Sequence, residues 1–292
     1  MFGWHRPQSE TRVLRSGRLW FPTPRELPYS RLRQIRDAAL NLVYPQDCLI
    51  CGVPVARYQD RSICGQCWQS LLQLRLLPPW CPLCGVPLGF QLSEQPDRER
   101  RAGFVAAEPA SLCLKCALQV PPYAGARSFG YYTSELRQLI QSFKFKGRPD
   151  LACLLAPLLA SVYLESWPER EADLIIPVPL HAKRKRERGF NQAALIGTRM
   201  ARLIGLDYCE KALARVRSTP PQIGLTDAER LRNVRHAFKC TQPGLVRGRR
   251  LLLIDDVMTT GATVASATEA LMQGGALRIS VLTVARAVPG VE

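Results

Sequence analysis

The sequence predicts an α/β protein in which a mainly parallel sheet, covered by helices, follows a small cysteine-rich domain. From residue 128 onward, short apolar runs that suit buried strands alternate with helical segments, a pattern typical of a parallel sheet covered on both faces. Upstream, eight cysteines form four Cys-x-x-Cys pairs. We expect three parts: a disordered Arg-rich head (1–30), a helix with the cysteine-rich domain (31–120) and the α/β domain (121–292).

The composition favours a globular protein with a polyanionic or phosphorylated partner. The 292 residues are 47% hydrophobic, which is enough for a sizeable core, and the net charge is +16. Enrichment in Arg alone could raise this charge, and the Arg-rich head could also bind nucleic acid or act as a transit segment. No apolar run approaches the ~18 residues of a membrane span, and no secretory signal pattern is present. We therefore expect a cytoplasmic protein without membrane insertion.

The spacing of the paired cysteines indicates metal binding. In a chain without an export signal, thiols stay reduced, so four regular pairs favour metal over disulfides. Two residues between two thiolates allow a tight turn to direct both sulfurs at one tetrahedral ion. Gly52 and Gly85 follow the first and third pairs, where a knuckle needs a residue that tolerates positive φ. Redox pairs and an iron–sulfur cluster are the alternatives, but neither explains four repeats with two knuckle glycines.

We expect two consecutive structural zinc ribbons with four cysteines each. Sequential pairing is favoured over interleaved pairing. The predicted ligands are Cys48, Cys51, Cys64 and Cys67 at site one, and Cys81, Cys84, Cys113 and Cys116 at site two. The other three cysteines, Cys153, Cys209 and Cys240, suit small buried hydrophobic positions.

Apolar periodicity and end signals predict the helices. Upstream of the first ribbon, apolar residues at helical spacing after Ser30 predict a helix that ends before Pro45. Thr226 with Glu229 forms a capping box that predicts a short helix. The other predicted helices cover 134–143, 151–164 with a kink at Pro157, 191–203 before Gly205, and 263–272.

Short apolar or aromatic runs bounded by turn residues predict the strands. They cover 128–132, 173–178, 211–216, 251–254 and 279–285. In parallel sheets, ligands bind beyond the carboxyl ends of the strands. This rule directs attention to Asp255 and Asp256, which we expect to end the strand 251–254.

The segment LLLIDDVMTTGAT, residues 251–263, predicts a sugar-phosphate site. Its Thr- and Gly-rich loop leads into a helix N-terminus, whose free backbone N–H groups form a cradle for a phosphate. The two aspartates cannot face the same phosphate without repulsion. They suit ribose hydroxyls and the edge of a magnesium shell. One loop would therefore recognise both ends of a ribose 5-phosphate.

LLLIDDVMTTGAT resembles the diphosphoribosyl-binding signature of type I phosphoribosyltransferases over all 13 of its positions. Three further segments are similar to the ComF/GntX family: IIPVPLHAKRKRERGFNQAALIG (175–197), SELRQLIQSFKFKGR (134–148) and RVRSTPPQIGLTDAERLRNVRHAF (215–238). With the cysteine pairs, the resemblance covers about residues 31–287. It implies the parallel sheet of type I phosphoribosyltransferase architecture behind a double zinc ribbon.

The resemblance also implies the roles of the site residues. Phosphoribosyl pyrophosphate with magnesium would be bound by Asp255, Asp256, Val257, Met258, Thr259, Thr260, Gly261, Ala262 and Thr263. The loop 179–188, with Lys183, Arg184 and Arg188, would bind pyrophosphate, and a mobile loop from Arg215 to Leu225 would close over the substrate. Asp255, Asp256 and Arg215 are the implied catalytic residues. The implied reaction is pentosyl transfer to an acceptor that the sequence does not identify. The zinc ribbons could supply part of the hood, the part of these enzymes that covers the active site and varies between them.

A second hypothesis is a non-catalytic single-stranded DNA-binding protein on the same scaffold. ComF proteins, as a family, are implicated in natural transformation and the use of imported DNA. Single strands are held by basic grooves lined with aromatic residues. Phe190 beside the basic run 183–188, and Phe143 and Phe145 beside Lys144 and Lys146, fit that pattern. Core packing is the alternative role for these aromatics, and protein partners are not predicted.

Overall fold

The computed structural model of the chain describes residues 46–55, 62–88, 112–169, 171–217, 236–288 and 290–291. The Arg-rich head, the helix predicted after Ser30 and the capping box Thr226/Glu229 lie outside the described residues. Most of the predicted mobile loop, from residue 218 onward, also lies outside them.

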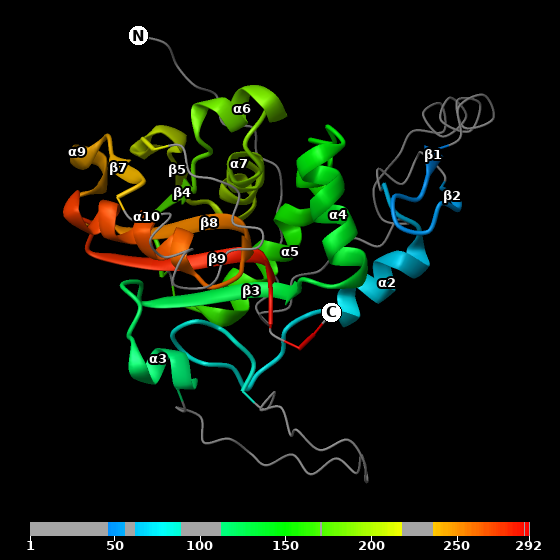
Figure 1. The fold of residues 1–292 in the computed structure, drawn as a ribbon, viewed down its shortest axis with the longest axis horizontal. Helices are drawn as coiled ribbons and strands as arrows, with labels where there is room; N and C mark the ends of the chain where they lie inside the picture. The colour runs from blue at the N-terminus through cyan, green and yellow to red at the C-terminus, as the bar shows by residue number, and fades with distance from the viewer. Residues whose placement is uncertain are drawn as a thin grey trace.

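The predicted parallel sheet is confirmed. Among the described residues it has five strands in the order β3-β9-β8-β4-β5, and every neighbouring pair is parallel. The strands are β3 (Gly125–Tyr131), β4 (Leu174–Pro177), β5 (Asp207–Tyr208), β8 (Arg250–Met258) and β9 (Arg278–Arg286). Figure 1 shows them crossing the centre of the molecule, with β8 and β9 in orange and red.

Side chains of the central strand alternate between two cores on opposite faces of the sheet. Leu252 and Ile254 point to the face covered by α5 (Leu151–Ser166) and α7 (Gln192–Ile204), with α4 (Ser134–Phe145) in the same core. Leu251 and Leu253 point to the face covered by α10 (Ala262–Gln273). All four side chains are at most 1% exposed, which explains the uninterrupted apolar run in the sequence.

The predicted end of the central strand was wrong. We expected the strand to stop before Asp255, but β8 continues to Met258 because β9 offers backbone partners along its whole length. Asp255 pairs in register with Thr283, and Met258 with Arg286. The two aspartates are therefore held on a strand and not on a loop.

Two further predictions are corrected next to the sheet. The expected loop 179–188 contains a helix, α6 (Ala182–Arg188), because the His181 side chain caps its N-terminus by accepting the amide of Lys183. The expected strand 211–216 is shorter and lies outside the main sheet. After a 3-10 turn, η2 (Glu210–Ala212), the strand β6 (Leu213–Arg215) pairs antiparallel with β7 (Phe238–Cys240), and α9 (Pro243–Val246) follows.

The first zinc ribbon packs on the face of the sheet that carries α4. It comprises β1 (Gln46–Asp47), β2 (Pro54–Val55) and α2 (Gly65–Gln73), and α2 contacts α4. Its buried Cys48, Cys67 and Leu71 belong to the same core as α5 and α7. Beyond α2, Leu74 and Leu76 hydrogen-bond with β3, so this segment covers the edge of the sheet.

The second ribbon packs on the opposite face. It includes α3 (Leu114–Leu118), and its buried Cys81, Cys84 and Cys116 belong to the core that contains α10. Figure 1 shows α3 near the start of β3, well separated from α2. Within the described part of the chain, no helix has the length and apolar character needed to cross a membrane.

Candidate functional site

Two clusters of four cysteines are present, and they follow the predicted sequential pairing. Cys48, Cys51, Cys64 and Cys67 form one, and Cys81, Cys84, Cys113 and Cys116 form the other. Within each cluster the sulfur atoms lie within 4.8 Å of one another. The closest described contacts, Cys51 to Cys64 and Cys84 to Cys113, are 3.6 Å. A tetrahedral zinc ion with Zn–S bonds of ~2.3 Å requires sulfur separations of about 3.8 Å, so both clusters fit zinc.

The knuckle backbone favours the thiolate form in each cluster. Gly52 and Gly85 have φ of 74° and 68°, as the knuckles require. Burial raises the pKa of the Cys48 thiol, but nearby backbone N–H groups outweigh burial and lower the pKa to about 6. The same balance lowers the pKa of Cys81 to about 7. These thiols are thus ready to ionise and bind a metal near neutral pH.

The sugar-phosphate candidate lies where the sheet topology changes direction. The chain leaves β4 toward β5 on one side, and it leaves β8 toward β9 on the other. Ligands bind to such sheets at this switch point, beyond the carboxyl ends of the two strands. Asp255 and Asp256 lie near the end of β8, and α6 follows the end of β4. The predicted phosphoribosyl and pyrophosphate segments therefore meet at one edge of the sheet.

The two aspartates have different environments. Asp256 forms an ion pair with Lys144 of α4 at 2.8 Å. Asp255 accepts a hydrogen bond from the Asp256 amide at 2.8 Å. Desolvation and the neighbouring Asp256 charge nevertheless raise the pKa of Asp255 to about 7. Within this part of the site, a bound cation or ribose hydroxyls would relieve the repulsion between the two carboxylates.

The residues after Asp256 form a strand end and a helix start. Val257 and Met258 still belong to β8, and their side chains pack into the cores on opposite faces of the sheet. Thr259 is exposed and Thr260 half-buried. The Thr260 hydroxyl accepts the Ala262 amide at 3.3 Å, at the start of α10.

Gly261 marks the turn from β8 into α10. Its φ of 83° lies in the left-handed region that favours glycine. Thr263 follows in the first turn of α10. The side chains of Val257, Met258 and Ala262 thus serve packing, and any ligand contact of theirs would come from the backbone.

Besides Lys144 of α4, cations from two further elements lie near the aspartates. Arg184 and Arg188 lie one turn apart on α6, and Arg215 lies on β6 with its guanidinium 5.4 Å from the Phe238 ring centroid. Arg188 is within electrostatic reach of Asp255, Asp256 and Arg184. Partial burial lowers the pKa of both Arg188 and Arg215, and Asp255 opposes the shift in each. Two carboxylates and several cations thus face one another in this site.

One predicted cation is not brought to this group. Lys183 is exposed in the first turn of α6, and its described hydrogen bond comes from its backbone amide. Lys185 pairs instead with Glu210 at 2.9 Å. The helical form of residues 182–188 separates these side chains from Arg184 and Arg188.

The segment RGFNQ, residues 188–192, holds Arg188 in place. Gly189 ends α6 with φ of 81°, and Phe190 packs against Phe143 with ring centroids 5.6 Å apart. Asn191 caps α7 through the Ala193 amide and donates to the Val178 carbonyl at 3.0 Å. Gln192 accepts from Arg188 at 2.9 Å. These structural roles had no separate signal in the sequence beyond the family motif.

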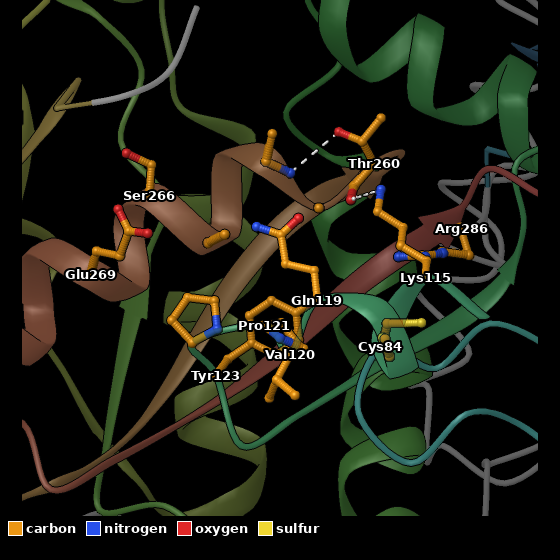
Figure 2. Close-up of a pocket in the computed structure, with 15 residues that line it drawn as sticks. Cys84, Lys115, Gln119, Val120, Pro121, Tyr123, Thr260, Ser266, Glu269 and Arg286 are labelled. Atoms are coloured by element: carbon orange, nitrogen blue, oxygen red, sulfur yellow. Dashed lines mark hydrogen bonds between the residues drawn. The ribbon is translucent and has the colours of Figure 1, made fainter. Parts of the chain in front are cut away.

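A cavity of about 420 Å³ lies between the second ribbon and α10, and the segment Thr260 to Ala262 is part of its lining. Figure 2 shows Lys115 reaching Thr260 at its rim, with Arg286 and Cys84 nearby. The Lys115 ammonium donates to the Thr260 carbonyl at 3.0 Å. Sequence reasoning did not identify Lys115 or the ion-pair role of Lys144, because both contacts join segments far apart in the chain.

Known proteins match most of this chain. The double zinc ribbon domain family matches residues 39–117. The DNA utilization protein YhgH of Salmonella typhimurium is 32% identical over 248 residues, which cover 84% of this chain and 99% of that protein. Competence protein F of Haemophilus influenzae is 29% identical over 77% of this chain and 91% of its own length. Competence protein ComFC of Bacillus subtilis is 24% identical, covering 78% and 85%.

Solved structures match one part of the chain. Glutamine phosphoribosylpyrophosphate amidotransferase of B. subtilis has a TM-score of 0.32 and 21% identity over 50% of this chain, and this chain covers 30% of that enzyme. The allosteric regulatory enzyme of purine biosynthesis has a TM-score of 0.33 and 24% identity, with coverages of 49% and 29%. The chain thus spans less than a third of either enzyme. From its curated relatives, the chain belongs to the ComF/YhgH family, with a double zinc ribbon before an α/β domain built on a parallel sheet.

Proposed function

We propose that the protein binds phosphoribosyl pyrophosphate with magnesium at the carboxyl ends of β4 and β8. One observation carries the proposal: Asp255 and Asp256 face Lys144, Arg188 and Arg215 beside the N-terminus of a buried helix. A ligand that suits this site needs hydroxyl groups or a cation for the carboxylates and two phosphate groups for the rest. Phosphoribosyl pyrophosphate has these features in one molecule.

The residues divide the ligand between them. Asp255 and Asp256 would accept hydrogen bonds from the ribose hydroxyls, and the segment Thr259 to Thr263 would hold the 5-phosphate with backbone N–H and hydroxyl groups. Arg184, Arg188 and Arg215 would face the diphosphate. Asp255 and Asp256 would also hold magnesium, which would neutralise the charge that develops on the diphosphate. Each group is placed by a different element, so the ligand would bridge β6, α6 and β8.

The chemistry that this placement supports is transfer of the phosphoribosyl group. The bond between the anomeric carbon and the diphosphate would break, with its electron pair leaving on the diphosphate, and a lone pair of the acceptor would form the new bond to that carbon. The arginines would stabilise the negative charge that develops on the leaving group. Positioning of the acceptor opposite the diphosphate supplies the rest of the rate enhancement. We propose pentosyl transfer as the reaction class, without assigning the acceptor.

A thermal unfolding experiment tests the binding proposal. The melting temperature is measured with magnesium alone and with magnesium plus phosphoribosyl pyrophosphate, for the parent and for Asp255→Asn/Asp256→Asn. A ligand at ~100 times its Kd stabilises the folded state by about 2.7 kcal/mol, which gives a clear upward shift. We expect this shift in the parent and its loss in the double variant. If the ligand does not raise the melting temperature of the parent, the proposed transferase function is wrong.

A specific observation also favours a single-stranded DNA surface at the rim of the site. Phe145 is 72% exposed, and the Arg188 guanidinium lies 5.2 Å from its ring centroid. An exposed aromatic ring beside cations suits base stacking and phosphate contact. Relatives of this chain are named for DNA utilization and competence. We propose a role in the use of imported DNA, with direct strand binding as the second candidate function.

Fluorescence anisotropy with a labelled single strand weighs this second function. Binding by Phe145→Ala should be weaker than binding by the parent, because stacking contributes about 1–3 kcal/mol per base. Leu277→Ala is the matched control, since Leu277 is 65% exposed and lies before β9 at the opposite edge of the sheet. A weak signal that does not depend on salt, or equal losses in both variants, would count against strand binding.

A further inference from the structure

A side chain of the second zinc ribbon reaches into the proposed phosphate loop. Lys115 lies on α3, directly before the zinc ligand Cys116. Its ammonium group donates to the Thr260 carbonyl at 3.0 Å across 145 residues of sequence (Figure 2). This contact joins the two parts of the molecule at the loop that would hold the 5-phosphate.

The contact fixes the orientation of one peptide group. In a trans peptide the C=O and the following N–H point in opposite directions. Because Lys115 holds the Thr260 carbonyl toward the ribbon, the Gly261 N–H points away from the ribbon. Gly261 has a φ of 83° and, as glycine, could adopt the reversed orientation at little cost. Without Lys115, the peptide would be able to turn and take this N–H out of the phosphate cradle.

The position of Lys115 depends in turn on the second cysteine cluster. α3 starts directly after Cys113, and Cys116 within it is buried. Gly85 of the same ribbon lies so close to β3 that an added Cβ would be 2.4 Å from the Ala126 carbonyl oxygen. The ribbon is therefore seated directly against the edge of the sheet.

Two arginines, Arg286 buried and Arg127 half-buried, extend from the sheet toward this cluster. Arg127 of β3 and Arg286 of β9 are both within electrostatic reach of the Cys84 sulfur. Arg286 is only 5% exposed, and within the described residues its Nε and Nη1 atoms have no hydrogen-bond partner. Zinc bound by four thiolates carries a net charge of −2, which would compensate both cations. Metal at site two would thus favour the docked position of the ribbon, and with it the position of Lys115.

We propose that the second zinc ribbon is a working part of the sugar-phosphate site, with Lys115 as a positioning residue for the 260–261 peptide. This inference rests on the proposed function and adds a regulatory element to it. Occupancy of zinc site two sets the position of α3, α3 sets the orientation of the Gly261 N–H, and that N–H contributes to the affinity for a phosphorylated sugar.

The first test measures binding of phosphoribosyl pyrophosphate and magnesium by calorimetry. Lys115→Met should weaken binding about tenfold, the low end for a hydrogen bond to a charged group because Lys115 is exposed. Lys115→Arg, which can still donate to the carbonyl, should bind within about twofold of the parent. Lys211→Met removes an exposed Lys of η2 and is the charge-matched control. Zinc content is measured for every variant.

The second test follows the loop itself in the ligand-free protein. Hydrogen exchange of a peptide that spans residues 256–263 should be faster in Lys115→Met than in the parent, and unchanged in Lys115→Arg. Equal exchange and equal affinity in Lys115→Met, with zinc retained, would overturn the inference. If the parent does not bind the ligand but exchange responds to Lys115, the positioning role stands and the proposed function fails.

Discussion

Replacement of Asp255 by Asn should stabilise the protein while removing its proposed ligand site. Asp255 is partly buried beside Asp256, and desolvation with this like charge raises its pKa from 3.8 to about 7. Asn has nearly the same shape and keeps the oxygen that accepts the Asp256 amide. The substitution therefore removes the charge with little change in packing.

The size of the effect follows from the change in pKa. A difference of about 3 pH units corresponds to about 4 kcal/mol. We expect up to about this much stabilisation at pH ~8, where the Asp255 carboxyl of the parent is largely ionised in the folded state. Since the folded state holds its proton more tightly than the unfolded state, the cost to the parent is absent below pH ~4, grows between pH ~4 and ~7, and stays constant above pH ~7. At pH ~5 the difference between variant and parent should be about a third of its value at pH ~8.

Urea unfolding of the parent and of Asp255→Asn at both pH values, followed by Trp fluorescence, measures this difference. Both proteins carry the same zinc clusters, so the pH dependence of metal binding cancels. Asp207→Asn is the control, because this exposed carboxylate pairs with Arg249 on the surface. A stability difference that is independent of pH, or a variant less stable than the parent at pH ~8, would refute the reasoning.

Three further predictions test other parts of the molecule. Lys144→Met should lower the free energy of unfolding by about 1 kcal/mol, because the ion pair with Asp256 is lost. It should also move the pH-dependent step in the stability of the protein above pH ~7. Arg137→Met, which removes an exposed cation of the same helix, should have neither effect. Gly85→Ala should lower the free energy of unfolding by about 3 kcal/mol, because an added Cβ would lie 2.4 Å from the Ala126 oxygen. Gly52→Ala, at a glycine with similar φ and open space around it, should lower it by about 1 kcal/mol. Equal losses, measured by chemical unfolding, would contradict the described docking of the second ribbon. Metal analysis should give two zinc ions per chain. A chelator should remove the ion of site one faster than that of site two, because Cys51 is exposed while site two has no fully exposed cysteine. Removal of both ions at the same rate would contradict this prediction.

Four of the five strands that the structure describes in the sheet, and both metal sites, were predictable because their signals are local, whereas the two-residue strand β5 was not predicted. A buried parallel strand is recognised from its own apolar run, as in residues 251–254, and a four-cysteine site from two short pairs. Even the end of α7 follows from one residue, since Gly205 has a φ of 69° there. The strand end at Asp255 was wrong because it depends on β9, a partner that is distant in sequence.

The composition of the site was only partly predictable for the same reason. Arg184 and Arg188 were identified together with Lys183, because their sequence neighbourhood is alike. The helix α6 decides between them, since residues four apart share one face. Lys144 and Lys115 come from elements outside the motif, and only the packing of α4 and of the second ribbon brings them to Asp256 and Thr260.

The central claim is that the end of β8 and the start of α10 hold a phosphorylated ribose. Calorimetric titration of the full chain with phosphoribosyl pyrophosphate and magnesium tests it most directly, with Asp255→Asn/Asp256→Asn as the matched variant. We expect the parent to bind one phosphoribosyl pyrophosphate per chain, ribose 5-phosphate to compete with this binding, and the variant to show no measurable binding. Equal binding by parent and variant, or no binding by a parent that holds both zinc ions, would contradict it.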